Sequence, residues 1–182
     1  MDIKECLMNH PVIAAVKTDE IRLSECEVYF ILEGRLGELK AAVEGLKAEN
    51  KMIFVHIDLI KGIKADVAGL EFLKSYINPT GIITTNQRLI SEAKKIGLQT
   101  ILRLFLLDSK NLKSGIQMIH KCQPDAVEIL PGALHKVTEM IVRESKGPVI
   151  TGGLIMDKDD VIGSLKVGAM GVSTSNASLW SI

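Results

Sequence analysis

Small residues follow two short β-branched strands in the last part of the chain. Gly152 and Gly153 come directly after the first strand, and Ser173, Thr174 and Ser175 end the second. Because these side chains are small or absent, backbone N–H groups can approach an anion closely there. The two strand ends therefore predict a cradle for a phosphate group.

Two charged side chains interrupt apolar strands. Arg103 lies inside the run 99–106, and Glu128 lies inside the run 126–130. An unpaired charge in an apolar strand is costly, so we expect the two to pair across neighbouring strands. A role in ligand binding is compatible with this pairing, since buried ion pairs often lie at functional sites.

Other polar residues lie in or near the ends of earlier strands. Asp58 is a candidate for ligand binding, with a loop cap as the alternative. Lys61 would supply a point charge at the mouth of a phosphate site, or would simply lie in solvent. His56 lies within a strand and is interpreted as a core histidine with satisfied hydrogen bonds. Glu33 follows another strand, and its role stays open.

Eight short apolar strands that alternate with helical segments position these residues. We expect strands at 12–16, 28–32, 52–57, 81–84, 99–106, 126–130, 148–151 and 171–174. We expect helices at 19–25, 36–49, 65–76, 86–96, 110–121, 134–143, 159–166 and 177–180. Strands of the buried type in alternation with helices indicate a parallel sheet, and eight repeats favour a closed barrel.

The predicted fold is a single compact (β/α)8 TIM-type barrel domain over residues 1–182, with minimal helices and a truncated last helix. In such a barrel the loops after the seventh and eighth strands are the usual phosphate cradle. These are the loops that contain Gly152–Gly153 and Ser173–Ser175. An apolar face left open beside the last strand would favour a homo-oligomer, because a second copy would cover it.

The charge balance excludes a protein that is basic all over. The chain of 182 residues has 22 Lys and Arg and 22 Asp and Glu, which gives a formal net charge of +0. RNA binding needs only a local basic face. Candidates for such a face are Lys110, Lys113, His120 and Lys121 on one helix and Lys136 and Arg143 on the next, with an ordinary solvated surface as the alternative.

Several classes of site and location are not expected. The three cysteines and four histidines have no metal-ligand spacing, so neither a metal site nor a disulfide framework is predicted. Dinucleotide-binding and Walker motifs are also missing, and we expect no cofactor. The sequence has no secretory signal and no apolar run of bilayer length, which predicts a cytoplasmic protein without membrane contact.

Seven strings in the same order along the chain resemble the glycerol uptake operon antiterminator regulatory proteins. They are HIDLIKG (56–62), GIITT (81–85), AKKIGL (93–98), RLFLLDS (103–109), PDAVEILPG (124–132), GGLI (152–155) and VSTSN (172–176). Leu179 and Trp180 complete the pattern. The resemblance implies a barrel that binds glycerol 3-phosphate and acts on leader mRNA to prevent premature transcription termination of glycerol-catabolic genes.

The resemblance also implies roles for the candidate residues. The two small-residue segments become the phosphate cradle, and Asp58, Arg103 and Glu128 become candidates for binding the glycerol hydroxyls or holding the site's shape. Glu33 departs from the family pattern, in which a small or polar residue is expected.

Two other classes of function remain open. A barrel enzyme of the isomerase or aldolase type would use Asp58 or Glu128 as a base and Lys61 as an electrostatic or Schiff-base residue on a small phosphorylated substrate. A degenerate barrel would serve only as a scaffold for protein interactions.

Overall fold

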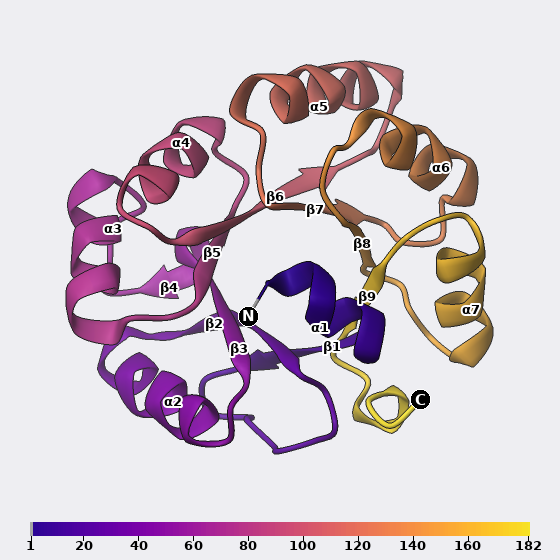
Figure 1. Ribbon diagram of the computed structural model, residues 1–182. Coiled ribbons are helices and arrows are strands. Elements are labelled where there is room, and N and C mark those ends of the chain that lie inside the picture. The colour runs from indigo at the N-terminus through magenta and orange to yellow at the C-terminus, as the bar shows by residue number, and fades with distance from the viewer. Residues whose placement is uncertain (1) are drawn as a thin grey trace.

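Eight parallel strands close into a barrel in the computed structural model, which describes residues 2–182 (Figure 1). The strands around the barrel are β1 (Val12–Lys17), β9 (Gly171–Thr174), β8 (Val149–Gly152), β7 (Ala126–Leu130), β6 (Gln99–Phe105), β5 (Gly81–Thr84), β3 (Met52–His56) and β2 (Val28–Arg35). β2 then pairs with β1 and closes the ring. A two-residue strand, β4 (Ile60–Lys61), extends the end of β2. The predicted barrel is confirmed.

Helices form a ring outside the barrel (Figure 1). They are α2 (Leu36–Ala48), α3 (Val67–Phe72) continued by a π-helical turn η2 (Leu73–Ile77), α4 (Gln87–Lys95), α5 (Ser109–Cys122), α6 (His135–Glu144) and α7 (Lys158–Lys166). Side-chain caps fix several starts: Asn86, Asp108 and Asp157 accept backbone N–H bonds in the first turns of α4, α5 and α7. The helix expected at 110–121 is thus confirmed, and it begins one residue earlier, at Ser109.

The segment 19–25 is a loop, and the helix expected there is absent from this part of the chain. Side chains from elsewhere bind its carbonyl groups: the Tyr29 hydroxyl donates to Arg22 O at 3.0 Å, and Lys51 Nζ donates to Ser24 O at 2.9 Å. Helical hydrogen bonds would compete for such carbonyls, so tertiary contacts override the local helix signal.

A helix that the sequence analysis missed, α1 (Ile3–Asn9), lies across one end of the barrel (Figure 1). Its first turn is fixed by a capping box in which Asp2 and Glu5 bond to each other's backbone N–H groups. Ile3, Cys6 and Leu7 are buried against interior strand residues. This end holds the strands' amino termini, so α1 closes the barrel on the side opposite the predicted site.

The last turn, η3 (Ala177–Leu179), is a single 3-10 turn in place of the helix expected at 177–180. Leu179 and Trp180 are each 5% exposed and pack on the core cluster outside β1 and β2. The Trp180 indole Nε1 also donates to Thr174 O at 2.9 Å. The turn therefore covers apolar surface beside the last strand and anchors its end.

Candidate functional site

A cavity of about 170 Å³ opens at the carboxyl ends of the strands, in the loops expected to form the site. Its lining residues are Ala15, Leu32, Arg103, Glu128, Leu130, Gly153, Leu154, Ile155, Ser173, Thr174 and Ser175. Six of the nine residues predicted from the sequence thus share one hollow. Pockets for drug-sized ligands are larger, about 300–1,000 Å³, so the size suits a small metabolite.

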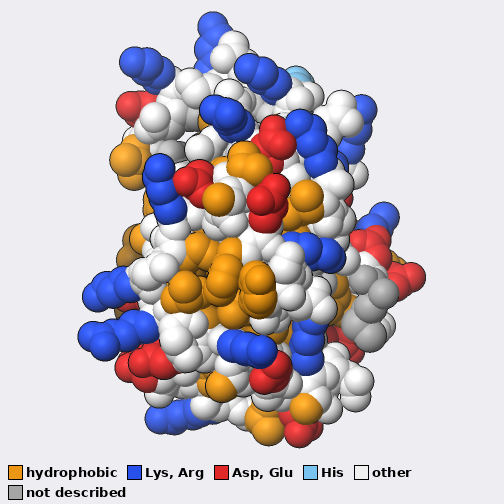
Figure 2. Space-filling view, turned by 90° about the vertical axis from the view of Figure 1, so that its left-hand side faces the viewer, with side chains coloured by type: hydrophobic (Ala, Val, Ile, Leu, Met, Phe, Trp, Pro, Cys, Tyr) orange, Lys and Arg blue, Asp and Glu red, His pale blue; other side chains and the backbone are white. Residues whose placement is uncertain are grey.

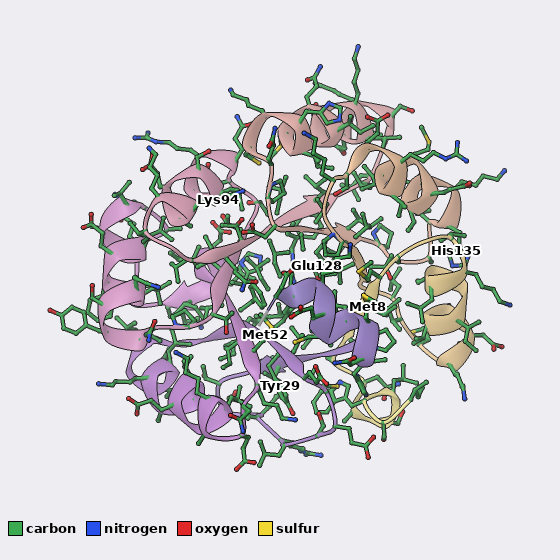
Figure 3. All side chains as sticks on the ribbon, viewed as in Figure 1. Met8, Tyr29, Met52, Lys94, Glu128 and His135 are labelled. Atoms are coloured by element: carbon green, nitrogen blue, oxygen red, sulfur yellow. The ribbon has the colours of Figure 1, made fainter. Side chains whose placement is uncertain are left out.

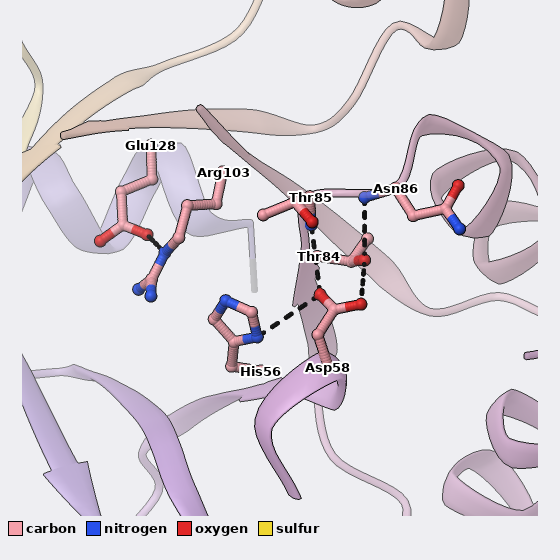
Figure 4. Close-up of polar contacts among 7 residues, drawn as sticks. All are labelled: His56, Asp58, Thr84, Thr85, Asn86, Arg103 and Glu128. Carbon is pink, nitrogen blue, oxygen red and sulfur yellow. Dashed lines mark hydrogen bonds and ion pairs between the residues drawn. The ribbon is translucent and has the colours of Figure 1, made fainter. Parts of the chain in front are cut away.

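Glu128 joins two strands and the cradle through one carboxylate. Arg103 lies opposite it in the β6–β7 register, and Arg103 Nε donates to Glu128 Oε2 at 2.6 Å (Figure 4). Ser173 Oγ donates to the other oxygen, Oε1, also at 2.6 Å. The expected pairing of Arg103 with Glu128 is confirmed, and it leaves the guanidinium's Nη groups as further donors.

The carboxylate of Glu128 points into the barrel rather than toward the helices, as Figure 3 shows. It is 0% exposed, and Arg103 is 5% exposed. Both charges are therefore desolvated, and each compensates the other at the floor of the cavity.

The backbone after β8 requires glycine at two successive positions for different reasons. A Cβ on Gly152 would lie 2.4 Å from Ser173 Oγ and 2.8 Å from Glu128 Oε1, so this residue makes room for the hydrogen-bonded group beside it. Gly153 has φ +71°, a left-handed conformation that glycine adopts without strain. Leu154 follows with φ 57° and lines the cavity. The local backbone therefore turns sharply around the hollow.

The second half of the cradle is held by its own side chains. Thr174 Oγ1 accepts the Asn176 backbone N–H at 3.1 Å, and Thr174 O accepts the Trp180 indole N–H. Ser173 and Thr174 are buried, whereas Ser175 is exposed. The segment is thus rigid at its base and open toward solvent at Ser175.

Asp58 lies beside the cavity rather than in its lining. It follows β3 in a 3-10 turn, η1 (Ile57–Leu59), and accepts bonds from Thr84 Oγ1 at 3.1 Å and from the Thr85 backbone N–H at 3.2 Å (Figure 4). The carboxylate therefore links the ends of β3 and β5. A role of Asp58 in binding the ligand or in holding the shape of the site stays a prediction.

His56 is the polar residue that the sequence analysis undervalued. Its Nδ1 is buried without a hydrogen-bond partner among residues 2–182 and lies 3.5 Å from Asp58 Oδ2 (Figure 4). Burial, with the positive charge of Arg103, lowers the pKa of His56 to about 4, although Asp58 acts in the opposite direction. The ring is therefore neutral at pH 7.

The signal that would have found His56 is strand alternation. Met52 and Phe54 point into the barrel, so His56, two residues further along, does so too.

Lys61 and Glu33 line a different hollow, of about 190 Å³, together with Lys17, Arg35 and Glu38. β4 pairs with the end of β2, and this pairing carries Lys61 away from the cradle. Side chains of both signs of charge surround the lysine there, which makes this hollow electrostatically mixed.

The described residues contain neither a metal cluster nor a helix that could span a membrane. Within residues 2–182, no cluster of three or more His, Cys, Asp or Glu side chains is arranged to hold a metal ion. The helices of this same range are too short or too polar to cross a membrane.

Comparison with known proteins gives consistent matches over nearly the whole chain. Residues 12–180 match the family model described as glycerol-3-phosphate responsive antiterminator. A protein of Escherichia coli K12, named uncharacterized protein YgcP, is 32% identical, with 100% of this chain and 97% of that protein covered.

Solved structures of similar sequence have the same fold. A glycerol uptake operon antiterminator regulatory protein from Listeria monocytogenes is 35% identical with a TM-score of 0.86, covering 94% of this chain and 95% of that one. An antiterminator-related protein from Thermotoga maritima is 32% identical with a TM-score of 0.83, covering 94% and 98%.

A likeness to an enzyme extends to the fold alone. The N-acetylmannosamine-6-phosphate 2-epimerase of Clostridium perfringens has a TM-score of 0.70 over 96% of this chain and 89% of its own, but only 14% identity. The family model, in contrast, matches on sequence from the first barrel strand to the last turn. The chain belongs to the glycerol-3-phosphate responsive antiterminator family.

Proposed function

We propose that this protein binds glycerol 3-phosphate in the cavity at the barrel mouth and controls transcription antitermination by binding leader mRNA. The observation that carries the proposal is the convergence of Arg103, Glu128, Gly153 and the Ser173–Ser175 segment on one small cavity. Family membership supports the choice of ligand.

The phosphate is proposed to occupy the side of the cavity formed by Gly153 and Ser173–Ser175, with Gly152 directly before Gly153 in the chain. Glycine and small residues allow backbone N–H groups to approach the phosphate oxygens. Thr174 and Ser175 add hydroxyl donors. Arg103 supplies the positive charge nearest to this side.

Glu128 is proposed to bind a glycerol hydroxyl while it holds Arg103 and Ser173 in place. A carboxylate repels a phosphate dianion, so the glycerol end of the ligand is the part that suits it. Its two oxygens have further acceptor capacity beyond the two hydrogen bonds they already accept. The ligand's two ends would thus be distinguished by charge.

The regulatory step is proposed to act on RNA in the cytoplasm. A ligand shifts an equilibrium only if it binds one state better than the other. Glycerol 3-phosphate must therefore bind more tightly to the form that binds leader mRNA, and RNA binding must in turn tighten the ligand.

A role as regulator rather than enzyme is the other part of the proposal. The Schiff-base alternative needs a lysine beside the ligand, yet the lining of this cavity, as described, includes no lysine. The carboxylates of both candidate bases are already engaged: Asp58 links β3 and β5, and Glu128 accepts from Arg103 and Ser173. These two observations favour binding without turnover.

Calorimetric titration tests the ligand and its site together. Wild-type protein should bind glycerol 3-phosphate, and Ser173→Ala should weaken binding by about tenfold, the effect of losing about 1.4 kcal/mol. Lys61→Ala is the matched control, since Lys61 lines the other hollow, and it should bind as wild type does. Phosphorus NMR of the same mixtures should show glycerol and triose phosphates unchanged.

Three results would contradict the proposal. If the wild type does not bind glycerol 3-phosphate, the proposed ligand is wrong. If Ser173→Ala binds it with wild-type affinity, the proposed binding site is wrong. Conversion of a glycerol or triose phosphate would make the protein an enzyme.

A further inference from the structure

Charge is strongly segregated along this electrically neutral chain. The segment 60–122, which contains α3, α4 and α5, has ten Lys or Arg and four Asp or Glu, and the rest of the chain has twelve and eighteen. One of the ten, Arg103, lies inside the barrel. Seven of the other nine lie on η2 (Leu73–Ile77), α4 and α5, which makes this side basic.

α5 contributes the most uniform part of this basic side. It contains Lys110, Lys113 and Lys121 and no Asp or Glu. These lysines and Gln117 are all exposed, at spacings of three and four residues, so they form one stripe along the helix. Arg88, in the first turn of the adjacent α4, adds a further cation.

An exposed aromatic pair lies on the same side of the molecule. Phe72 ends α3 and Tyr76 lies in η2, and their rings stack with centroids 4.8 Å apart and an interplanar angle of 29°. Phe72 is 37% exposed and Tyr76 is 64% exposed. Of the other aromatic residues, Tyr29, Phe30, Phe54 and Trp180 are buried, and Phe105, at the end of β6, is 50% exposed.

Figure 2 views the molecule from the side on which α3 lies, at the left of Figure 1. Hydrophobic side chains gather at the centre of this face. Lys and Arg side chains lie around them with some Asp and Glu between, and the positive side chains are most numerous toward the end where α4 and α5 lie. Val67, Phe72 and Tyr76 are the large exposed hydrophobic residues of α3 and η2. An apolar platform bordered by cations has the chemistry of a single-stranded nucleic acid surface, in which bases stack and phosphates pair with lysine.

We propose that single-stranded RNA lies across α3, α4 and α5, with bases stacked on Phe72 and Tyr76 and its phosphates on the lysines of α5 and on Arg88. This inference rests on the proposed function and gives the RNA a surface on the protein. The surrounding cations argue for RNA over a second copy of the chain, because two copies meeting at this face would bring like charges together.

The platform also has a direct connection to the barrel mouth. α3 and η2 form the crossover that leaves β3 after Asp58 and returns to β5, which ends at Thr84. Asp58 and Thr84 are hydrogen-bonded to each other. The segment that forms the aromatic part of the proposed RNA surface therefore connects β3 to β5. The ends of these two strands are linked by Asp58.

The experiment selects RNA from a random-sequence pool on wild-type protein with glycerol 3-phosphate present, then measures the affinity of variants for the selected RNA. Phe72→Ala/Tyr76→Ala should bind about tenfold or more weakly, as loss of base stacking predicts. Lys110→Glu/Lys113→Glu should bind more weakly and should lower the slope of log K against log salt. Both variants change exposed side chains, and their thermal unfolding is measured alongside.

Matched controls are available on other parts of the surface. Lys158→Glu/Lys166→Glu makes the same charge change on α7, and Leu23→Ala removes an exposed apolar side chain in the loop 18–27. Both should bind the selected RNA as wild type does.

The outcomes separate this inference from the proposed function. If wild-type protein selects no RNA, with or without glycerol 3-phosphate, the proposed function fails and the surface with it. If RNA is selected but both α3 and α5 variants bind as wild type does, only the surface is wrong. Unchanged RNA affinity together with a change of oligomeric state in Phe72→Ala/Tyr76→Ala would assign the platform to a second copy instead.

Discussion

At the scale of single residues, the cavity depends on a carboxylate that lies in the barrel interior. Glu128 accepts from Arg103 and Ser173, so it aligns one donor on the neighbouring strand and one on the cradle. A buried ion pair gives little net stability because both charges lose their hydration. Its value here is positional: it holds the guanidinium against the cavity.

Removal of one partner of this ion pair should cost far more than removal of both charges. Arg103→Met leaves the Glu128 carboxylate buried and unpaired, and should lower the free energy of unfolding by about 3–5 kcal/mol. Arg103→Met/Glu128→Gln should recover most of that loss, because the introduced amide is neutral and its oxygen can still accept from Ser173. Urea unfolding of the wild type, Arg103→Met, Glu128→Gln and the double variant measures the coupling free energy.

The exposed pair of Arg143 with Glu139 provides the control for this cycle. Arg143→Met should change the unfolding free energy by about 1 kcal/mol or less. Equal costs for Arg103→Met and the double variant would contradict the expected penalty for an unpaired buried carboxylate.

His56 should make the protein less stable as the pH falls. Its pKa is about 4 in the folded state against an ordinary value of 6.5, so the unfolded chain binds a proton at a pH where the folded one does not. The unfolding free energy should therefore fall between about pH 6.5 and pH 4, by about 3 kcal/mol from this group. Unfolding of wild type and His56→Gln across that range should give a flatter curve for the variant.

Met8, which is 70% exposed and has no titratable side chain, serves as the control for this measurement. Met8→Ala should keep the wild-type dependence on pH. Parallel curves for wild type and His56→Gln would show that the histidine is not desolvated as described.

The extent to which the site could be predicted depended on how each residue is positioned. Arg103 and Glu128 were predictable as a pair because strand alternation and neighbouring strands fix the direction of both side chains. The position of Lys61 was not predictable, because η1 and β4 redirect the chain after β3. Such short elements have a weak sequence signal. His56 was expected to have satisfied hydrogen bonds. The sequence of an apolar strand does not show whether the ring nitrogens of a histidine in it find hydrogen-bond partners.

At the scale of elements, hydrophobic runs and turn signals identified all eight barrel strands and the helices from α2 to α7. The errors fell where tertiary contacts decide the structure. The loop 18–27 is held by Tyr29 and Lys51, residues outside it. α1 was missed because its apolar residues are few and find partners only inside the closed barrel.

Two glycine-to-alanine changes should have opposite effects on stability. Gly45 lies on the exposed side of α2 with open space for a Cβ, so Gly45→Ala should stabilise the protein by about 0.5–1 kcal/mol. Gly152→Ala places its Cβ against Ser173 Oγ and Glu128 Oε1, and should destabilise it by about 1–3 kcal/mol. Thermal unfolding checks both signs.

Ligand titration adds a second readout to this comparison. Gly152→Ala should also weaken glycerol 3-phosphate binding, because the displaced Ser173 belongs to the proposed cradle, whereas Gly45→Ala should leave binding unchanged. A stable Gly152→Ala protein with wild-type affinity would contradict the described packing of the cradle.

At the scale of the whole molecule, the two ends of the barrel have different roles. The amino end is filled by aromatic and aliphatic side chains, including an edge-to-face pair of Phe30 and Phe54 at 5.9 Å, and is closed by α1. The carboxyl end contains the cavity with its polar lining residues, among them Arg103, Glu128 and Ser173. Stability and ligand binding should therefore be separable by mutation, as the general division of such barrels suggests.

Leu7 on α1 offers the sharpest test of that separation. It is 2% exposed and packs so closely on the last strand that a Cβ on Gly171 would lie 2.8 Å from Leu7 Cδ2. Leu7→Ala should lower the unfolding free energy by about 2–5 kcal/mol through the cavity it leaves. The adjacent Met8 is 70% exposed, so Met8→Ala should change stability by less than about 0.5 kcal/mol. Both proteins, measured where they are fully folded, should bind glycerol 3-phosphate with wild-type affinity, because α1 closes the opposite end of the barrel. A weaker affinity in folded Leu7→Ala would mean that packing at the amino end sets the geometry of the mouth, and the two ends would then act as one unit.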